Sequence, residues 1–411
     1  MGALEFLCDI RFHKKFVLPP NPETGRNKPY RVSYSDYGDS TSNAVVLFCG
    51  ALMGTRLSYA TLDQLARAYN VRIIHPDRPG IGGSDAVDLE KRIQTWLEMV
   101  PPLLAHLRIP YVSLASHSGG DIYLLNTMLT HPHILHPTNP YVCFFAPWVH
   151  PSHTKVMHMW ATELLPAPII GKYALAAKFV TENVIPLAGM SGSLVQGIKG
   201  SLLRSNPPPG PVPLAQATTR SRPPSICSHE RTNTLALEEP KVVEELRNHI
   251  TTFLFAETMD GISADAQLFM KKPRSLPWSS PSTLWPDIDC AVPLLSKMIN
   301  EDGRVGSNSR KWIIDTFHAS EDEMVGDKGR QWFDDCWKSD QTSTTSVHSV
   351  SSQAAQPPSQ KNYVYRSQVV KRTDHNFLLD PVFGASESWL QRVAEAFQIP
   401  TGVDNMIQAS P

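Results

Sequence analysis

Strand-like and helix-like segments alternate along the first third of this chain. Short apolar runs typical of buried strands lie at 30–34, 44–48, 71–75, 111–115 and 141–145, and two more follow at 311–317 and 363–370. Segments with helical spacing of apolar residues lie between several of them, at 57–69, 89–107, 121–131, 327–337 and 386–397. This alternation predicts an α/β protein with a mainly parallel central sheet that is covered by helices on both faces.

The alternation stops after Trp148 and resumes near residue 311. Between these points the chain is apolar and helix-like at 160–165, 167–186 and 241–256, with prolines that interrupt the pattern. We therefore predict a core formed by 1–148 and 305–400, a helical cap at 149–304, and a tail at 401–411. A Pro-rich loop is expected at about 205–240 and a disordered insertion at about 339–360, because these segments are polar and low in complexity.

Charge, cysteines and termini exclude several classes of protein. A formal net charge of -1 gives no electrostatic reason to expect a nucleic acid or an anionic membrane as partner. The six cysteines are scattered without a C-x-x-C pair, which argues against a disulfide framework and a structural zinc site. The first twenty residues lack the apolar stretch of a secretory signal, and no apolar run is long enough to span a bilayer. We expect a soluble, cytoplasmic protein.

Residues 116–120, with the sequence SHSGG, follow a predicted strand and precede a predicted helix. A strand, a tight turn of small residues and a helix form the nucleophile elbow, which exposes one side chain at the top of a sheet. Here that side chain is Ser118, the candidate nucleophile. Ser116 departs from the usual G-x-S-x-G pattern but is small enough for the position.

An aliphatic serine needs a base within hydrogen-bond reach and an acid that orients the base. His375 follows the last predicted strand and is the candidate base, while the neighbouring Asp374 is expected to cap the following segment. Asp322 follows the predicted strand at 311–317 and is the candidate acid; Asp315, Glu321 and Glu323 lie close by and remain open as alternatives.

The chemistry also needs backbone donors for the developing oxyanion. One is expected to be the amide of Gly119, directly after the nucleophile. The other is expected in the loop at 49–54, with Ala51 as first choice and Leu52 as second. For substrate contacts we predict Leu52, His117 and Trp148. The apolar cap favours a hydrophobic acyl or alkyl group in a small-molecule substrate.

At this point the chain resembles the α/β-hydrolase superfamily of cap-bearing serine hydrolases, and in its long loops it looks like uncharacterised fungal relatives. Four motifs carry the resemblance: the loop Cys49-Gly50-Ala51, the sequence DRPGIGGS at 77–84, the elbow at Ser118, and Thr373-Asp374-His375. The order Ser118, Asp322, His375 is also that of the superfamily.

The resemblance implies a helical cap inserted after the sixth strand of the sheet. It also implies a cofactor-free enzyme that acts through an acyl-enzyme on an ester, thioester or amide-like bond. From the residues themselves we expect no metal site. Cys49 replaces the histidine that many relatives have before this glycine. Relatives that open epoxides or remove halides use aspartate at the elbow, so Ser118 argues against both reactions.

Several alternatives stay beside this interpretation. The glycines at 80–83 lack the complete G-x-G-x-x-G pattern, and we interpret them as a turn next to the active site rather than a nucleotide loop. His131, His133 and His136 are better explained by a helix end than by a metal. The chain could also be a small-molecule-binding sensor or weakly active protein on a hydrolase scaffold, or a cofactor-free lyase or C–C hydrolase. The sequence does not determine substrate identity or oligomeric state.

Overall fold

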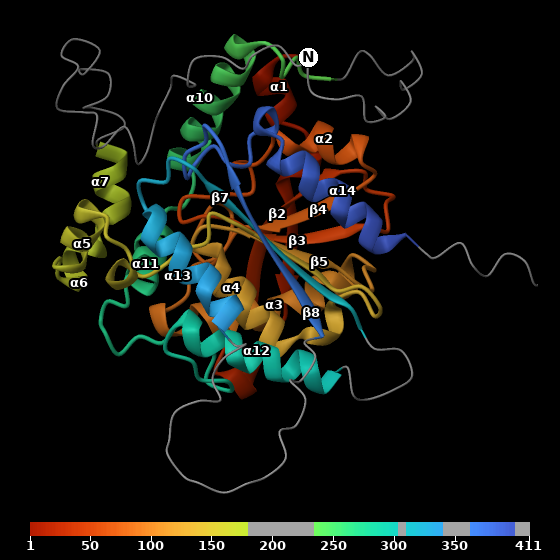
Figure 1. The fold of residues 1–411 in the computed structure, drawn as a ribbon. Helices are drawn as coiled ribbons and strands as arrows, with labels where there is room; N and C mark the ends of the chain where they lie inside the picture. The colour runs from red at the N-terminus through yellow and green to blue at the C-terminus, as the bar shows by residue number, and fades with distance from the viewer. Residues whose placement is uncertain (180–233, 303–309, 340–361, 399–411) are drawn as a thin grey trace, which may run out of the picture.

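The structure is a computed structural model that describes residues 1–179, 234–302, 310–339 and 362–398 (Figure 1). The tail and almost all of the expected insertion at about 339–360 lie outside the described residues. So does most of the expected Pro-rich loop at about 205–240. Among the described helices, none is long and apolar enough to cross a membrane.

Eight strands form one sheet in the order β1-β2-β4-β3-β5-β6-β7-β8. Two pairings at one edge, β1 with β2 and β2 with β4, are antiparallel, and the other five are parallel. This confirms the mainly parallel sheet. The strands are β1 (Lys14–Leu18), β2 (Tyr30–Gly38), β3 (Val45–Cys49), β4 (Arg72–Pro76), β5 (Ser113–His117), β6 (Tyr141–Phe145), β7 (Trp312–Ala319) and β8 (Tyr363–Val370).

Helices cover both faces of the sheet. Further helices belong to the segment of the chain that connects β6 to β7. The helices outside that insertion are α1 (Ala3–Leu7), α2 (Leu62–Ala68), α3 (Arg92–His106), α4 (Gly120–Thr130), α13 (Gly326–Ser339) and α14 (Ala385–Phe397). The helices described within the insertion are α5 (Met157–Glu163), α6 (Ala167–Ile170), α7 (Tyr173–Phe179), α10 (Pro240–Ala256), α11 (Asp260–Phe269) and α12 (Ile288–Asp302). Short 3-10 turns are η1 (Ile10–His13), η2 (Pro22–Thr24), η3 (Leu89–Lys91), η4 (Pro132–Ile134), η5 (Pro151–His153) and η8 (Pro381–Phe383).

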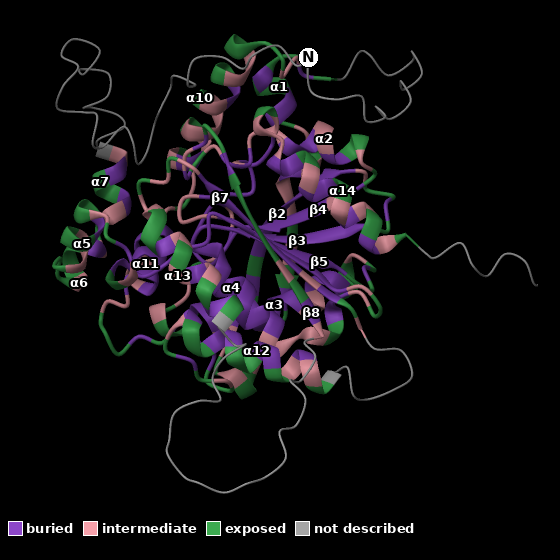
Figure 2. Ribbon diagram, in the orientation of Figure 1, coloured by how far each residue is buried: buried purple, intermediate pink, exposed green. Residues whose placement is uncertain are grey.

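The core has two large apolar clusters, one on each face of the sheet. Side chains alternate across a strand, so Val45, Leu47 and Cys49 of β3 belong to one cluster, and Val46 and Phe48 belong to the other. Helices α3, α4, α12 and α13 supply the first cluster, and α1, α2 and α14 supply the second. Figure 2 shows the central strands β3 and β5 buried between these helical layers, whereas the edge strand β8 is largely exposed.

The insertion after β6 has outer and inner parts. Helices α5, α6 and α7 lie far from the sheet (Figure 1), and α11 lies closer, next to α6 and α7. Helix α12 packs on α4 and α13, within the helical layer that covers the sheet.

The structure differs from the predicted elements mainly at the N-terminus and at β5. Strand β1 was not predicted because it is an edge strand whose side chains alternate between half-buried and exposed, so it lacks a continuous apolar run. The strand expected at 111–115 is shifted by two residues. Its pairing with β3 begins at Ser113 opposite Val46, and Tyr111 is exposed.

The strand order positions the site. The chain passes from β3 outward to β4 and then returns to β5 on the other side of β3. At such a switch point, the loops that follow the two neighbouring parallel strands leave the same edge of the sheet and diverge, which creates a crevice. The loop at 50–54 follows β3, and Ser118 follows β5.

Candidate active site

Ser118 lies in a sharp turn between β5 and α4. Its φ is 52°, an uncommon value for a residue with a side chain, and its amide donates to the Phe145 carbonyl oxygen at 2.9 Å. A Cβ on Gly120 would lie 2.2 Å from the Cys49 carbonyl oxygen and 2.6 Å from that of Gly50, so this position requires glycine. The turn therefore packs directly on the loop that follows β3. Ser116, at the atypical position, is fully buried.

Three side chains from different loops meet at this turn. The Nε2 atom of His375 lies 2.7 Å from the Ser118 hydroxyl oxygen. Its Nδ1 atom lies 2.8 Å from Oδ2 of Asp322. Both distances are those of good hydrogen bonds. The structure thus brings together the candidate nucleophile, base and acid, although the nucleophile and the base are 257 residues apart along the chain.

Backbone hydrogen bonds fix Asp322 in place. Its Oδ1 accepts from the amides of Met324 at 2.9 Å and Val325 at 2.8 Å, which leaves Oδ2 to face His375. The loops after β7 and β8 are also joined, because the Glu321 amide donates to the Thr373 carbonyl oxygen at 2.9 Å.

Of the alternative acids, Asp315 pairs with arginines on the second face of the sheet instead. Its carboxylate lies 2.6 Å from Nε of Arg366 and 2.6 Å from Nη1 of Arg392. The expected cap at Asp374 is confirmed, since its Oδ1 accepts from the amides of Asn376 and Phe377.

The surroundings of His375 and Asp322 shift the pKa of both side chains. Burial alone lowers the pKa of His375, but the charge and hydrogen bond of Asp322 outweigh it and hold the pKa above its ordinary value. Burial alone raises the pKa of Asp322, but His375 and the two backbone amides bring the pKa below its ordinary value. Asp322 is therefore a carboxylate at neutral pH, with Nδ1–H of His375 as its donor.

The two loops that could hold an oxyanion contact each other. The Ala51 amide donates to the Tyr59 hydroxyl oxygen at 2.9 Å. Within the described part of the chain, neither the Leu52 amide nor the Gly119 amide has an acceptor. The Phe269 ring of α11 lies against Gly119, because a Cβ there would be 2.2 Å from a ring carbon. The insertion thus covers the elbow, and Ser118 is 5% exposed.

His117 faces the interior rather than open space. Its Nε2 lies 2.8 Å from the His375 carbonyl oxygen, so this nitrogen carries the proton and donates. The Tyr59 hydroxyl must then donate to Nδ1, at 2.9 Å. Burial and the charge of His375 lower the pKa of His117 to about 3, in agreement with a neutral ring. Tyr59 and His117 thereby link the Ala51 amide to the backbone of His375.

The other two residues predicted to contact substrate lie close to the insertion. Leu52 is half-buried and packs between the main core and a small cluster that includes Ile81 and Ile262. Trp148 is buried, and its indole Nε1 donates to the Phe269 carbonyl oxygen at 3.2 Å. Trp148 therefore supports the helix that carries Phe269.

The glycine-rich motif at 77–84 forms a turn that contacts the start of α11. Gly80 and Gly82 have φ values of 70° and 58°, and the Gly261 amide at the start of α11 donates to the Gly80 carbonyl oxygen at 2.8 Å. In the part of the chain that the structure describes, no group of three or more histidine, cysteine, aspartate or glutamate side chains could hold a metal ion.

Sequence reasoning missed three residues around this site: Tyr59, Arg78 and Phe269. Arg78 was visible only as part of the DRPGIGGS motif, and its side-chain contacts could not be read from the motif. Tyr59 and Phe269 lie in segments without a recognisable motif, so no signal in a single sequence indicated them.

A scan against protein-family models gives no match, and neither does a search of curated proteins. Among solved structures, the haloalkane dehalogenase DbeA-M1 loop variant from Bradyrhizobium elkanii is 15% identical. The match covers 93% of this chain and 97% of that chain, with a TM-score of 0.50. A carboxylesterase structure from Nitrososphaera gargenis is 13% identical, with coverage of 92% and 99% and a TM-score of 0.48. The enol-lactonase from Burkholderia xenovorans LB400 is 10% identical, with coverage of 93% and 99% and a TM-score of 0.48.

The similarity to the dehalogenase, with a TM-score of 0.50 and 15% identity, establishes the architecture only. The chemistry must be inferred from the residues of this chain. The mainly parallel eight-stranded sheet flanked by helices agrees with it. The chain has the α/β-hydrolase fold.

Proposed function

We propose that the chain is a serine hydrolase that cleaves a carboxylic ester of a small hydrophobic molecule through an acyl-enzyme. The observation that carries the proposal is the continuous hydrogen-bonded series of Ser118, His375 and Asp322, with distances of 2.7 and 2.8 Å. A serine next to a buried, carboxylate-oriented imidazole is the arrangement that activates a hydroxyl nucleophile.

In the proposed reaction, the Ser118 hydroxyl gives its proton to Nε2 of His375 as its oxygen attacks the ester carbonyl carbon. The tetrahedral intermediate collapses when His375 returns the proton to the leaving alcohol, which leaves an acyl group on Ser118. A water molecule then attacks the acyl carbon with His375 as base, and the acid leaves as Ser118 regains its proton. Asp322 stabilises the imidazolium in both halves.

For the oxyanion we propose the Gly119 amide and an amide of the loop after β3. In this arrangement the Leu52 amide is the better second donor, because the Tyr59 hydroxyl already accepts from the Ala51 amide. Ala51 can serve only if Tyr59 releases it. The two amides would act through positions fixed before substrate arrives, which is the main source of stabilisation in such sites.

The preference for a hydrophobic substrate rests on the insertion. Phe269 is the side chain that α11 places against Gly119, and it is apolar. Among the described helices, we propose that the cap over the site comprises α5, α6, α7 and α11, because α10 packs on α1 and α12 packs on α4 and α13. Since Ser118 is 5% exposed, we propose that movement of this cap admits the substrate.

The test is turnover of p-nitrophenyl esters with acyl chains of two to about twelve carbons, in wild type, Ser118→Ala and His375→Ala. We expect hydrolysis by the wild type alone, with a preference for chains longer than acetate. Incorporation of ¹⁸O from labelled water into the acid would distinguish hydrolysis from a lyase reaction. Ester turnover that survives Ser118→Ala would refute the proposal, and saturable ligand binding without turnover would favour a sensor.

A further inference from the structure

The loop at 50–54, which we call the oxyanion loop, is hydrogen-bonded through its carbonyl groups to the buried Arg78. The guanidinium of Arg78 donates to the Gly50 carbonyl oxygen, to that of Ala51 at 2.6 Å and to that of Leu52 at 3.0 Å. Three successive carbonyl groups therefore point at one cation. In a trans peptide the N–H points opposite to the C=O, so the amides of Ala51, Leu52 and Met53 point away from Arg78.

Arg78 is itself held by the insertion. Its Nε donates to Oδ2 of Asp265, on α11, at 2.7 Å. The other carboxylate oxygen of Asp265 accepts from Nε of Arg92 at 2.8 Å and from the Tyr123 hydroxyl at 2.6 Å. We call Arg78, Arg92, Tyr123 and Asp265 the Arg78 cluster. All four side chains are buried, and the cluster has two guanidinium groups but one carboxylate.

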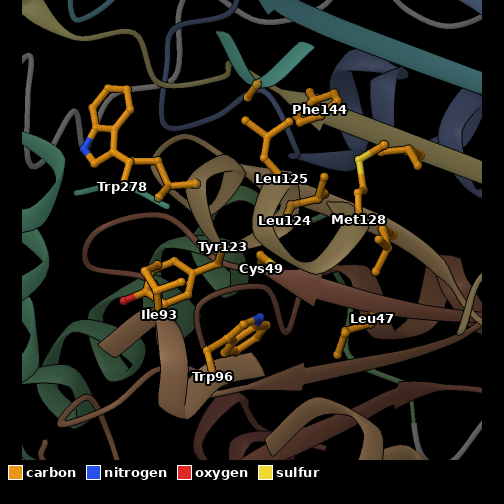
Figure 3. Close-up of a cluster of buried hydrophobic side chains, with 14 of the residues drawn as sticks. Leu47, Cys49, Ile93, Trp96, Tyr123, Leu124, Leu125, Met128, Phe144 and Trp278 are labelled. Atoms are coloured by element: carbon orange, nitrogen blue, oxygen red, sulfur yellow. The ribbon is translucent and has the colours of Figure 1, made fainter. Parts of the chain in front are cut away.

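The surroundings of the cluster are apolar. Figure 3 shows Tyr123 beside Ile93 and Trp96 and on the same helix as Leu124 and Leu125. In such surroundings an electrostatic interaction is stronger than in water, and a fork-shaped guanidinium holds its acceptors in one geometry. The positive charge behind the loop also favours negative charge at the amide ends of the same peptide units.

One helix therefore contacts both halves of the proposed oxyanion site. Asp265 of α11 holds Arg78 and so the loop after β3, and Phe269 of α11 lies against Gly119. Near the helix start, a Cβ on Gly261 would lie 2.1 Å from the Pro79 carbonyl oxygen, so α11 is seated closely on the turn that carries Arg78.

We propose that Arg78, held by Asp265, is a positioning residue that fixes the direction of the amides in the oxyanion loop, so that the inserted helix and the core assemble the site together. The inference rests on the proposed hydrolase function for its kinetic consequence. Its structural half, that Arg78 holds the loop, does not depend on that function.

The test compares Arg78→Lys with Arg92→Lys. Both variants keep a cation beside Asp265 and lose the several donors of the planar guanidinium. In wild type, Arg92 donates to the Pro79 carbonyl oxygen and not to the oxyanion loop. For p-nitrophenyl butyrate we expect Arg78→Lys to lower kcat by about 10- to 100-fold with KM within about threefold, somewhat less than the loss of a whole oxyanion donor. Arg92→Lys should lower kcat by a clearly smaller factor, because Arg78 keeps its bonds to the three carbonyl groups of the loop.

Two further readouts separate positioning from general damage. The inhibition constant of an alkyl trifluoromethyl ketone, whose adduct with Ser118 carries an oxyanion, should rise in Arg78→Lys by the same factor as kcat falls. Deuterium exchange of the peptide that covers 49–54 should be faster in Arg78→Lys than in wild type and unchanged in Arg92→Lys. If Arg78→Lys does not fold, Arg78→Gln provides a second variant, because it leaves Asp265 paired one-to-one with Arg92.

Equal loss of kcat in the two lysine variants, or unchanged exchange at 49–54 in a folded Arg78 variant, would overturn the inference. A wild type that hydrolyses no ester would instead refute the proposed function. The exchange experiment would still decide whether Arg78 holds the loop.

Discussion

Replacing Asp322 by asparagine should keep the proton of His375 on Nε2 instead of Nδ1. Oδ1 of Asp322 accepts from the amides of Met324 and Val325, and Oδ2 accepts from Nδ1–H of His375. The asparagine carbonyl must therefore take the Oδ1 position, and its NH₂ group must face Nδ1. Because NH₂ donates, Nδ1 becomes the acceptor and the proton moves to Nε2, which can no longer accept from Ser118.

The size of the effect follows from the cost of the other orientation. Turning the amide so that Nδ1–H keeps an acceptor would place NH₂ against the two backbone amides and leave two buried donors unpaired. At about 1–3 kcal/mol for each unpaired group, the competent form lies about 2–6 kcal/mol higher. With one decade of rate for about 1.4 kcal/mol, and with loss of the carboxylate charge added, we expect kcat to fall about 10³- to 10⁴-fold.

The assay is steady-state turnover of a p-nitrophenyl ester, with Asp374→Asn as the matched control. Asp374 also accepts from two backbone amides, whereas the two ring nitrogens of His375 bond to Asp322 and Ser118. The control should stay within about threefold of wild type, and KM should change little in either variant. A folded Asp322→Asn variant within tenfold of wild-type kcat would refute the reasoning.

Two further predictions concern protonation and packing. In wild type, kcat/KM should fall as pH decreases through the pKa of His375, which Asp322 holds above the ordinary value of histidine, because the protonated ring cannot accept from Ser118; an acid limb below the ordinary range of histidine would contradict this. Gly120→Ala should lower the melting temperature, by the equivalent of about 1–3 kcal/mol, and should slow acylation of Ser118, because the new methyl group meets the backbone of Cys49 and Gly50. Unchanged thermal unfolding and acylation rates in that variant would show that the turn and the loop are not closely packed.

The sheet and the meeting of the three candidate residues followed from local patterns. The apolar runs at 44–48 and 141–145 became β3 and β6. His375 and Asp322 were placed by their position after predicted strands. In a parallel sheet the ends of successive strands lie at the same edge, so order along the chain was enough to predict their proximity.

The contacts that support the site could not be predicted in this way. Asp265 lies 187 residues from Arg78, in a segment without strand or helix repeat, and nothing in one sequence pairs an isolated aspartate with an isolated arginine. The engagement of the Ala51 amide by Tyr59 depends on the exact direction of a backbone turn. Such details come from tertiary packing, which local propensity does not encode.

The central claim is that Ser118 is an activated nucleophile, and intact-mass analysis after treatment with a fluorophosphonate probe tests it most directly. The account predicts one adduct per wild-type chain, located on Ser118, and no adduct on folded Ser118→Ala or His375→Ala. A folded, monodisperse wild type that remains unlabelled after prolonged exposure to the probe, or labelling that persists in Ser118→Ala, would contradict it.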